Sequence, residues 1–259
     1  MTARRLGGLA VRTLGSGYTL PILVLVAWAV SVQAGWLDHR LWASPQSVVA
    51  AATVQVADGS LARDLVASLE RVFAGFVVGA GAGLVVGVLM ARVAAFDWLL
   101  GPMLNGVKQV ALFAWIPLIS IWLGSGDLAK SAFVALAAFF PVLLNAHEGV
   151  RSIDRRYLEV ASVLCLSRWQ RLRKVVLPAA LPSIVTGVRL ALIYSWLATI
   201  GAEYFFAAGA GIGNSMIDGR DEFRMDLVIL GMALIGLVGF ALNALAGGME
   251  RRLLGWRDR

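Results

Sequence analysis

Residues 65–90 read LVASLERVFAGFVVGAGAGLVVGVLM, an almost uninterrupted apolar stretch. A helix of about 20 apolar residues is long enough to cross the hydrocarbon core of a bilayer. Glycines recur at every fourth position of the stretch, at Gly75, Gly79, Gly83 and Gly87, which keeps them on nearly one helix face. Small residues on one face let a second helix approach closely inside a membrane. The stretch therefore predicts a membrane-spanning helix that packs against another helix, within the subunit or at the seam of a dimer.

The rest of the chain has the same character. Of its 259 residues, 59% are hydrophobic and only 15% are charged, and the mean hydropathy is +0.78. Soluble domains carry about 25% charged residues. We therefore expect an all-α, polytopic membrane helical bundle with about six transmembrane helices. The predicted spans are residues 18–36, 65–90, 107–123, 129–146, 182–206 and 227–249.

Basic residues flank these spans and explain the net charge of +7. Arg4, Arg5 and Arg12 precede the first span, and four arginines follow the last. Cytoplasmic segments of membrane proteins accumulate Lys and Arg, so both termini are expected in the cytoplasm. The segment between spans four and five falls on the same side and is also basic. Its basic residues are Arg151, Arg155, Arg156, Arg168, Arg171, Arg173 and Lys174.

The N-terminal segment has a second interpretation. Its arginines, the apolar stretch and Val32-Gln33-Ala34 resemble a signal peptide with a cleavage site. Cleavage after Ala34 leaves the topology of the other spans unchanged, and we favour retention because the stretch is long enough to span. The chain then divides into three parts. These are an N-terminal segment with the first helix and an outer loop (1–64), a membrane core (65–249) with a cytoplasmic loop at 149–180, and a basic cytoplasmic tail (250–259).

The cytoplasmic loop is predicted to contain two short helices. Ser167 and Gln170 have the spacing of a capping box, so the second helix is expected to begin at Arg168. Pro178 is expected to end that helix, because proline lacks an amide donor and clashes with the preceding turn, and Pro182 to begin the fifth span. Apolar residues at helical spacing define one face of the first helix. They are Tyr157, Leu158, Ala161, Leu164 and Cys165.

Several other kinds of site are not expected. The loop resembles a DNA-binding helix-turn-helix, but membrane spans adjoin it on both sides, so we expect no nucleic-acid partner. The single cysteine and two histidines have no metal-ligand spacing, and no catalytic cluster is seen. Residues 124–131, GSGDLAKS, resemble a phosphate-binding loop, but Ala129 replaces the second glycine. We therefore expect no cofactor on this chain, and we interpret Gly209, Gly211 and Gly213 as a flexible outer turn.

The loop resembles the cytoplasmic signature of ABC importer permeases. That signature is Glu-Ala-Ala, three residues, Gly, nine residues, then Ile-x-Leu-Pro. Here the register is Glu159-Val160-Ala161, Cys165 and Val175-Val176-Leu177-Pro178, with departures at Val160, Cys165 and Val175. A glycine in the position of Cys165 permits a left-handed backbone, which a cysteine disfavours.

Further matches extend the resemblance over roughly residues 65–248, to the nitrate, sulfonate and taurine branch of these permeases. They include Ile116-Pro117-Leu118, Trp122-Leu123-Gly124, Gly187-Val188-Arg189 and Ala202-Glu203. The resemblance implies a permease of the bacterial inner membrane that works as a pair, usually two copies of itself. Its partners would be a cytoplasmic ATPase dimer, which binds ATP and Mg, and a periplasmic solute-binding protein. The chain itself would not be an enzyme.

The resemblance also assigns an ATPase-docking surface to the loop. The arginines of the loop have an alternative explanation in the positive-inside bias of cytoplasmic segments. The alternative for Glu159 is a solvated helix residue with no docking role. The docking residues are Arg155, Glu159, Ala161, Cys165, Arg168, Leu177 and Pro178.

Polar residues within the spans are candidates for the translocation pathway. Arg189 lies about two turns into the fifth span, where a charge is costly unless it faces the bundle interior, a wet pathway or, by snorkelling, the interface. An interior arginine would suit an anionic solute. Glu203 is expected to gate the outer entrance, to accept bonds from outer-loop backbone, or to lie at the interface. Weaker candidates are Gln109, Asn105 and Trp115.

Three alternatives remain beside an importer of a small anion such as a sulfonate, taurine or nitrate. A permease for a pyrimidine or thiamine-precursor solute would share every motif. A secondary transporter driven by an ion gradient would not need the docking loop. An integral-membrane enzyme would need clustered His, Asp or Cys at a membrane face, and the sequence has no such cluster.

Overall fold

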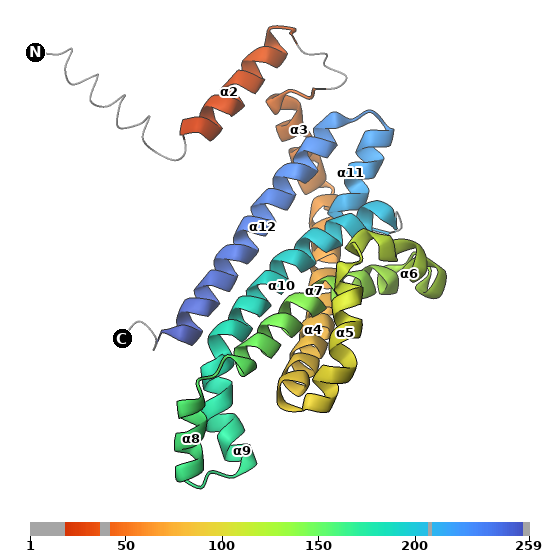
Figure 1. The fold of residues 1–259 in the computed structure, drawn as a ribbon. Helices are drawn as coiled ribbons and strands as arrows, with labels where there is room; N and C mark the ends of the chain where they lie inside the picture. The colour runs from red at the N-terminus through yellow and green to blue at the C-terminus, as the bar shows by residue number, and fades with distance from the viewer. Residues whose placement is uncertain (1–18, 37–41, 207–208, 256–259) are drawn as a thin grey trace, which may run out of the picture.

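The computed structural model describes residues 19–36, 42–206 and 209–255, which contain helices and no strand. The N-terminal arginines and Tyr18 lie outside these residues. In Figure 1 the long helices α4, α7, α10 and α12 form the body of the molecule, α8 and α9 project from one end, and α11 lies at the other. The elements are α2 (Thr19–Gln33), α3 (Pro45–Ala57), α4 (Ser60–Arg92), α5 (Ala94–Gln109), η1 (Leu112–Trp115), α6 (Ile116–Leu123), α7 (Asp127–Arg151), α8 (Arg155–Val163), α9 (Arg168–Arg171), η2 (Leu172–Val176), α10 (Leu177–Phe205), α11 (Ile212–Asp221) and α12 (Met225–Leu254).

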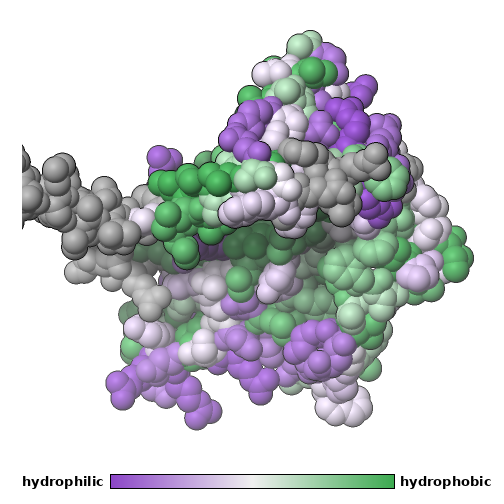
Figure 2. Space-filling model, turned by 90° about the horizontal axis from the view of Figure 1, so that it is seen from above, coloured by the Kyte–Doolittle hydropathy of each residue, from purple (hydrophilic) through white to green (hydrophobic). Residues whose placement is uncertain are grey.

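Four helices are long and apolar enough to cross a membrane: α4, α7, α12 and the continuous helix Arg168–Phe205. The pair formed by α5 and the η1–α6 segment makes a fifth if it counts as one span. α2, at the predicted first span, has 15 described residues and is shorter than these four helices. Hydrophobic side chains reach the outer edge of the molecule on the side of α6, where Ile121 and Trp122 are exposed (Figure 2). Such a surface is stable where lipid or another apolar surface covers it.

The predicted span over residues 107–123 is not one continuous helix. α5 ends at Gln109, and the axis of the next segment is bent by 99° relative to it. Val110 has an extended backbone, which interrupts the helical hydrogen bonds. Pro117 then lies in the first turn of α6, where its missing amide is not needed. Hydropathy averaged over the segment does not reveal this break, because the apolar residues around it outweigh Lys108 and Gln109.

The glycine face of α4 packs against α7 of the same chain. A Cβ atom added at Gly79 would overlap the backbone of Ala135, and one at Gly83 would overlap the carbonyl oxygen of Phe139. The two helix backbones are therefore in direct contact, as small residues allow between membrane helices. Of the two predicted locations for this face, the structure has the one within the subunit.

The cytoplasmic loop folds as two helices, and the capping box between Ser167 and Gln170 is present. The prediction that Pro178 ends the second helix is wrong. α9 continues through the π-helical turn η2 into α10, with Pro178 in the first turn of α10 and Pro182 inside it. The π turn shifts the hydrogen-bond register just before Pro178, so that the proline occupies a position where no amide donor is required.

Candidate functional site: a docking loop, a pocket and a buried ion cluster

The helices α8 and α9 present an exposed surface at one end of the molecule. Arg155, Glu159, Cys165 and Arg168 are exposed, and so are Leu177 and Pro178 at the start of α10. A groove of about 460 Å³ runs between α8 and the η2–α10 segment, and its walls include Tyr157, Val160, Leu164 and Pro178. Ala161 is the exception among the predicted docking residues: it is 1% exposed and supports α8 from within. Apolar side chains in this arrangement form a surface suited to a protein partner.

Cys165 makes the turn between the two helices in a left-handed conformation, with φ 49°. The amide of Leu166 donates to the carbonyl of Ala161, and the amide of Cys165 donates to the carbonyl of Ser162. These two bonds form a Schellman motif, which usually places glycine where Cys165 lies. Cysteine in place of the usual glycine therefore strains the backbone, because a side chain in the left-handed region costs about 1–2 kcal/mol.

Cys165→Gly is expected to stabilise the turn by about 1 kcal/mol by removing that strain. Hydrogen exchange of the amides of Cys165 and Leu166 should then slow about fivefold. Cys165→Ala is the matched control, since it removes the sulfur and keeps the Cβ atom. Equal exchange in both variants would contradict the strain argument.

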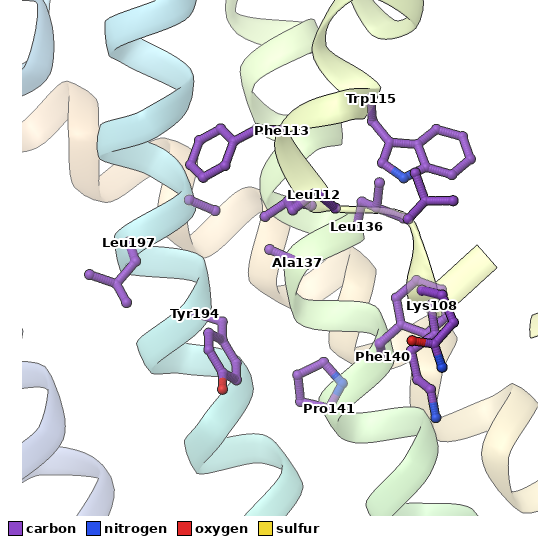
Figure 3. A pocket seen from close by; sticks show the side chains of 14 residues that line it. Lys108, Leu112, Phe113, Trp115, Leu136, Ala137, Phe140, Pro141, Tyr194 and Leu197 are labelled. Atoms are coloured by element: carbon purple, nitrogen blue, oxygen red, sulfur yellow. The ribbon is translucent and has the colours of Figure 1, made fainter. Parts of the chain in front are cut away.

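The break between α5 and η1 opens a pocket of about 590 Å³ against α7 and α10. Figure 3 shows Phe113, Trp115 and Phe140 around this pocket, with Tyr194 on α10 facing it and Lys108 at the end of α5. The complete lining is Lys108, Gln109, Val110, Ala111, Leu112, Phe113, Trp115, Leu136, Ala137, Phe140, Pro141, Tyr194, Leu197 and Ala198. Mostly apolar walls with a few polar groups are typical of a site for a small molecule.

Only some of the predicted pathway residues line this pocket. Gln109 and Trp115 line the pocket, whereas Asn105 is exposed on α5 away from it. Arg189 does not line it either: its guanidinium donates to the Glu250 carboxylate at 2.8 Å and to Asn243 Oδ1 at 3.1 Å, both on α12. A charge pair between α10 and α12 therefore satisfies Arg189, and its place in a translocation pathway stays a prediction.

Glu203 belongs to a buried cluster at the α11 end and is completely buried. Its carboxylate accepts hydrogen bonds from Ser68 at 2.8 Å, from Arg71 at 2.6 Å and from the Gly213 amide at 2.8 Å. Of the predicted roles, the contact with outer-loop backbone is the one observed, and the buried position does not suit an entrance gate. Arg71 also pairs with Asp127 at 2.8 Å.

Two sequence motifs contribute residues to this cluster. They are the glycines that we interpreted as a flexible turn and residues 124–131, which resemble a phosphate-binding loop. Gly211 has φ 154°, and a Cβ atom there would lie 2.5 Å from the Glu203 carboxyl carbon. The glycines therefore allow the backbone to approach Glu203, which corrects their interpretation as flexibility. Lys130 of residues 124–131 is fully buried and interacts electrostatically with Arg71 and Glu203.

Comparison with known proteins places these features in a family. Residues 83–255 match the family described as "Binding-protein-dependent transport system inner membrane component". The chain belongs to this family. It is therefore a transport permease, and the matched region contains the docking loop, the pocket and Glu203 but begins beyond Arg71.

Individual relatives agree with the predicted branch. The permease is 33% identical to SsuC of Bacillus subtilis (strain 168), named as an aliphatic sulfonates transport permease, over 93% of this chain and 87% of SsuC. It is 33% identical to the taurine transport system permease protein TauC of Escherichia coli (strain K12), over 92% and 88%. It is 36% identical to the bicarbonate transport system permease protein CmpB of Synechococcus elongatus, over 76% and 71%.

A solved structure shares the fold. The inward-facing MetNI methionine ABC transporter contains a chain that aligns with a TM-score of 0.58 and 20% identity, over 73% of this permease and 95% of that chain. The predicted all-α membrane bundle is thus confirmed, while the count of six spans stays a prediction.

Proposed function

We propose that this permease moves a small anion into the cell, driven by a separate ATPase that docks on the α8–α9 end. In this proposal that end is cytoplasmic, as its basic residues favour, and both termini lie on the same side. ATP and Mg bind to the ATPase dimer, and a periplasmic solute-binding protein delivers the solute at the α11 end. Family membership supports this assignment, since its description names a binding-protein-dependent system.

The observation that carries the proposal is the continuous helix from the docking loop to the pocket. Arg168–Phe205 is one helix, interrupted only by a π turn. At 1.5 Å per residue, Tyr194 lies about 39 Å from Arg168 along this helix. A movement imposed on α9 by a partner therefore reaches the pocket wall without an intervening loop. This linkage suits alternating access, in which ATP-driven closure of the partner opens the pathway outward and hydrolysis resets it.

A second copy of the chain is the proposed neighbour in the membrane. The helices on the two sides of the α5–η1 break carry exposed apolar side chains, among them Trp98, Met103 and Ile121. A second permease covering this face would close the pocket into a pathway between two subunits. The relatives named for sulfonates and bicarbonate support an anionic solute, and a pyrimidine-type solute is the alternative within the same machinery.

Glu159→Lys is expected to lower the amount of ATPase that co-purifies with the tagged permease at least tenfold. The side chain is exposed at the centre of the docking surface, and a reversed charge there opposes a partner that fits the native one. The measurement is quantitative mass spectrometry of the complex extracted in mild detergent.

Glu222→Lys is the control, because it reverses another exposed carboxylate, at the α11 end. Equal ATPase recovery from both variants would place the dock elsewhere. If no ATPase accompanies the wild-type permease and uptake in vesicles follows the proton gradient, a secondary transporter replaces the proposal.

A further inference from the structure

Lys108 is an exposed cation at the wall of the pocket. It lies in the last turn of α5 and lines the pocket at the α5–η1 break. α5 and the η1–α6 segment together are long and apolar enough to form one bent span, and Lys108 lies just before the bend. An ionisable residue inside a membrane-spanning segment is costly and usually has a functional reason.

Three other cations in the long helices, Arg71, Arg189 and Lys130, have charged neighbours, and Lys108 differs from these three. Arg71 pairs with Glu203 and Asp127, and Arg189 pairs with Glu250. Lys130 is buried in the same cluster as Arg71. Lys108 makes no hydrogen bond or ion pair with any of the residues that the structure describes. Its ammonium group is therefore available to a molecule that enters the pocket.

The surroundings of Lys108 fit one class of ligand. Gln109 adds a neutral amide, and the aromatic rings of Phe113, Trp115 and Phe140 supply apolar walls. An ammonium group binds oxyanions as a compact point charge, and an apolar wall accepts a short carbon chain. A neutral heterocycle gains little from an unpaired cation.

We propose that Lys108 is the residue that selects small oxyanions in this pocket, in the role that the sequence had suggested for Arg189. The proposal rests on the proposed transport function and adds its selectivity. The competing structural role is that of a lysine stabilised by the carbonyl end of α5. A charge-dependent transport readout separates the two, since helix stabilisation would change protein yield and not solute preference.

The first experiment measures uptake by cells that express the complete transporter. The probes are radiolabelled ethanesulfonate, taurine and bicarbonate, with radiolabelled uracil as the neutral comparison. Lys108→Gln is expected to lower uptake of the transported anion at least tenfold, and Lys108→Arg to keep it within about threefold, because a charged hydrogen bond is lost only in the first. Arg92→Gln is the control: it removes an exposed positive charge at the end of α4, outside the pocket.

The second experiment restores the charge chemically. Cys165→Gly removes the only native cysteine; because Cys165 lies on the docking surface, the uptake by Cys165→Gly permease itself is the reference. In that background Lys108→Cys is labelled, and the labelling is verified by mass spectrometry. Cationic aminoethyl methanethiosulfonate should recover at least half of the uptake, whereas neutral methyl methanethiosulfonate should not.

The possible outcomes distinguish failure of the role of Lys108 from failure of the proposed transport function. Normal anion uptake in Lys108→Gln, or equal recovery with the neutral reagent, would overturn the role of Lys108 while ATP-dependent uptake stands. Wild-type uptake of uracil and of none of the three anions would also overturn it. If no ATPase co-purifies with the wild-type permease, the proposed function itself is rejected.

Discussion

Glu203→Ala is expected to prevent most of the permease from reaching a stable folded state. The substitution leaves Arg71 and Lys130 buried at the α11 end, with Asp127, whose side chain is 75% exposed, as the remaining carboxylate partner of Arg71. Breaking a buried pair by removing one partner costs about 3–5 kcal/mol, because an uncompensated charge stays buried. A loss of that size is a large part of the about 5–15 kcal/mol that stabilises a folded protein.

The measurement is the yield of monodisperse permease in detergent, followed by thermal unfolding of what remains. Glu250→Ala is the matched control, since it breaks the pair with Arg189, whose side chain is 39% exposed. Partly exposed pairs contribute about 1 kcal/mol or less, so the control should retain most of its yield. Equal yields for the two variants would show that the buried cluster does not stabilise the fold.

This cluster could not be predicted from the sequence because its members are far apart in the chain. Arg71 and Glu203 are separated by 132 positions, and Lys130 comes from a third helix. Taken locally, residues 124–131 resemble a phosphate loop and Gly211 resembles a flexible turn. Only the packing of α4, α7 and α10 shows that these residues belong to one site.

Local features were predicted well. The capping box between Ser167 and Gln170 depends on residues three positions apart, and it is present. The motif register also singled out Cys165 as the position of the turn, although it left the conformation of the turn open. The break after Gln109 and the helix through Pro178 were missed, since each depends on how neighbouring helices accommodate a change in hydrogen-bond register. Lys108 was missed although a signal was available: it is a charge within an apolar segment that a bend turns toward a pocket.

Gly79→Ala is expected to destabilise the permease by about 3 kcal/mol, although it adds a single methyl group. The new Cβ atom would overlap the carbonyl group and Cα of Ala135, which are backbone atoms and cannot rotate away. α4 and α7 would have to separate along their whole contact, and overpacking of this kind costs about 1–3 kcal/mol or more. Thermal unfolding in detergent measures the effect.

Gly81→Ala is the control because it lies in the same helix two positions away, and nothing lies within 4 Å of the Cβ atom that it would add. It should unfold at or slightly above the wild-type temperature, since alanine favours a helix more than glycine does.

The same pair of variants also tests where the glycine face packs. A seam between two copies would leave Gly79→Ala folded but monomeric, whereas contact within the chain lowers the stability of the subunit itself. Measuring mass by light scattering alongside unfolding distinguishes the two, and a stable monomer would contradict the packing of α4 on α7.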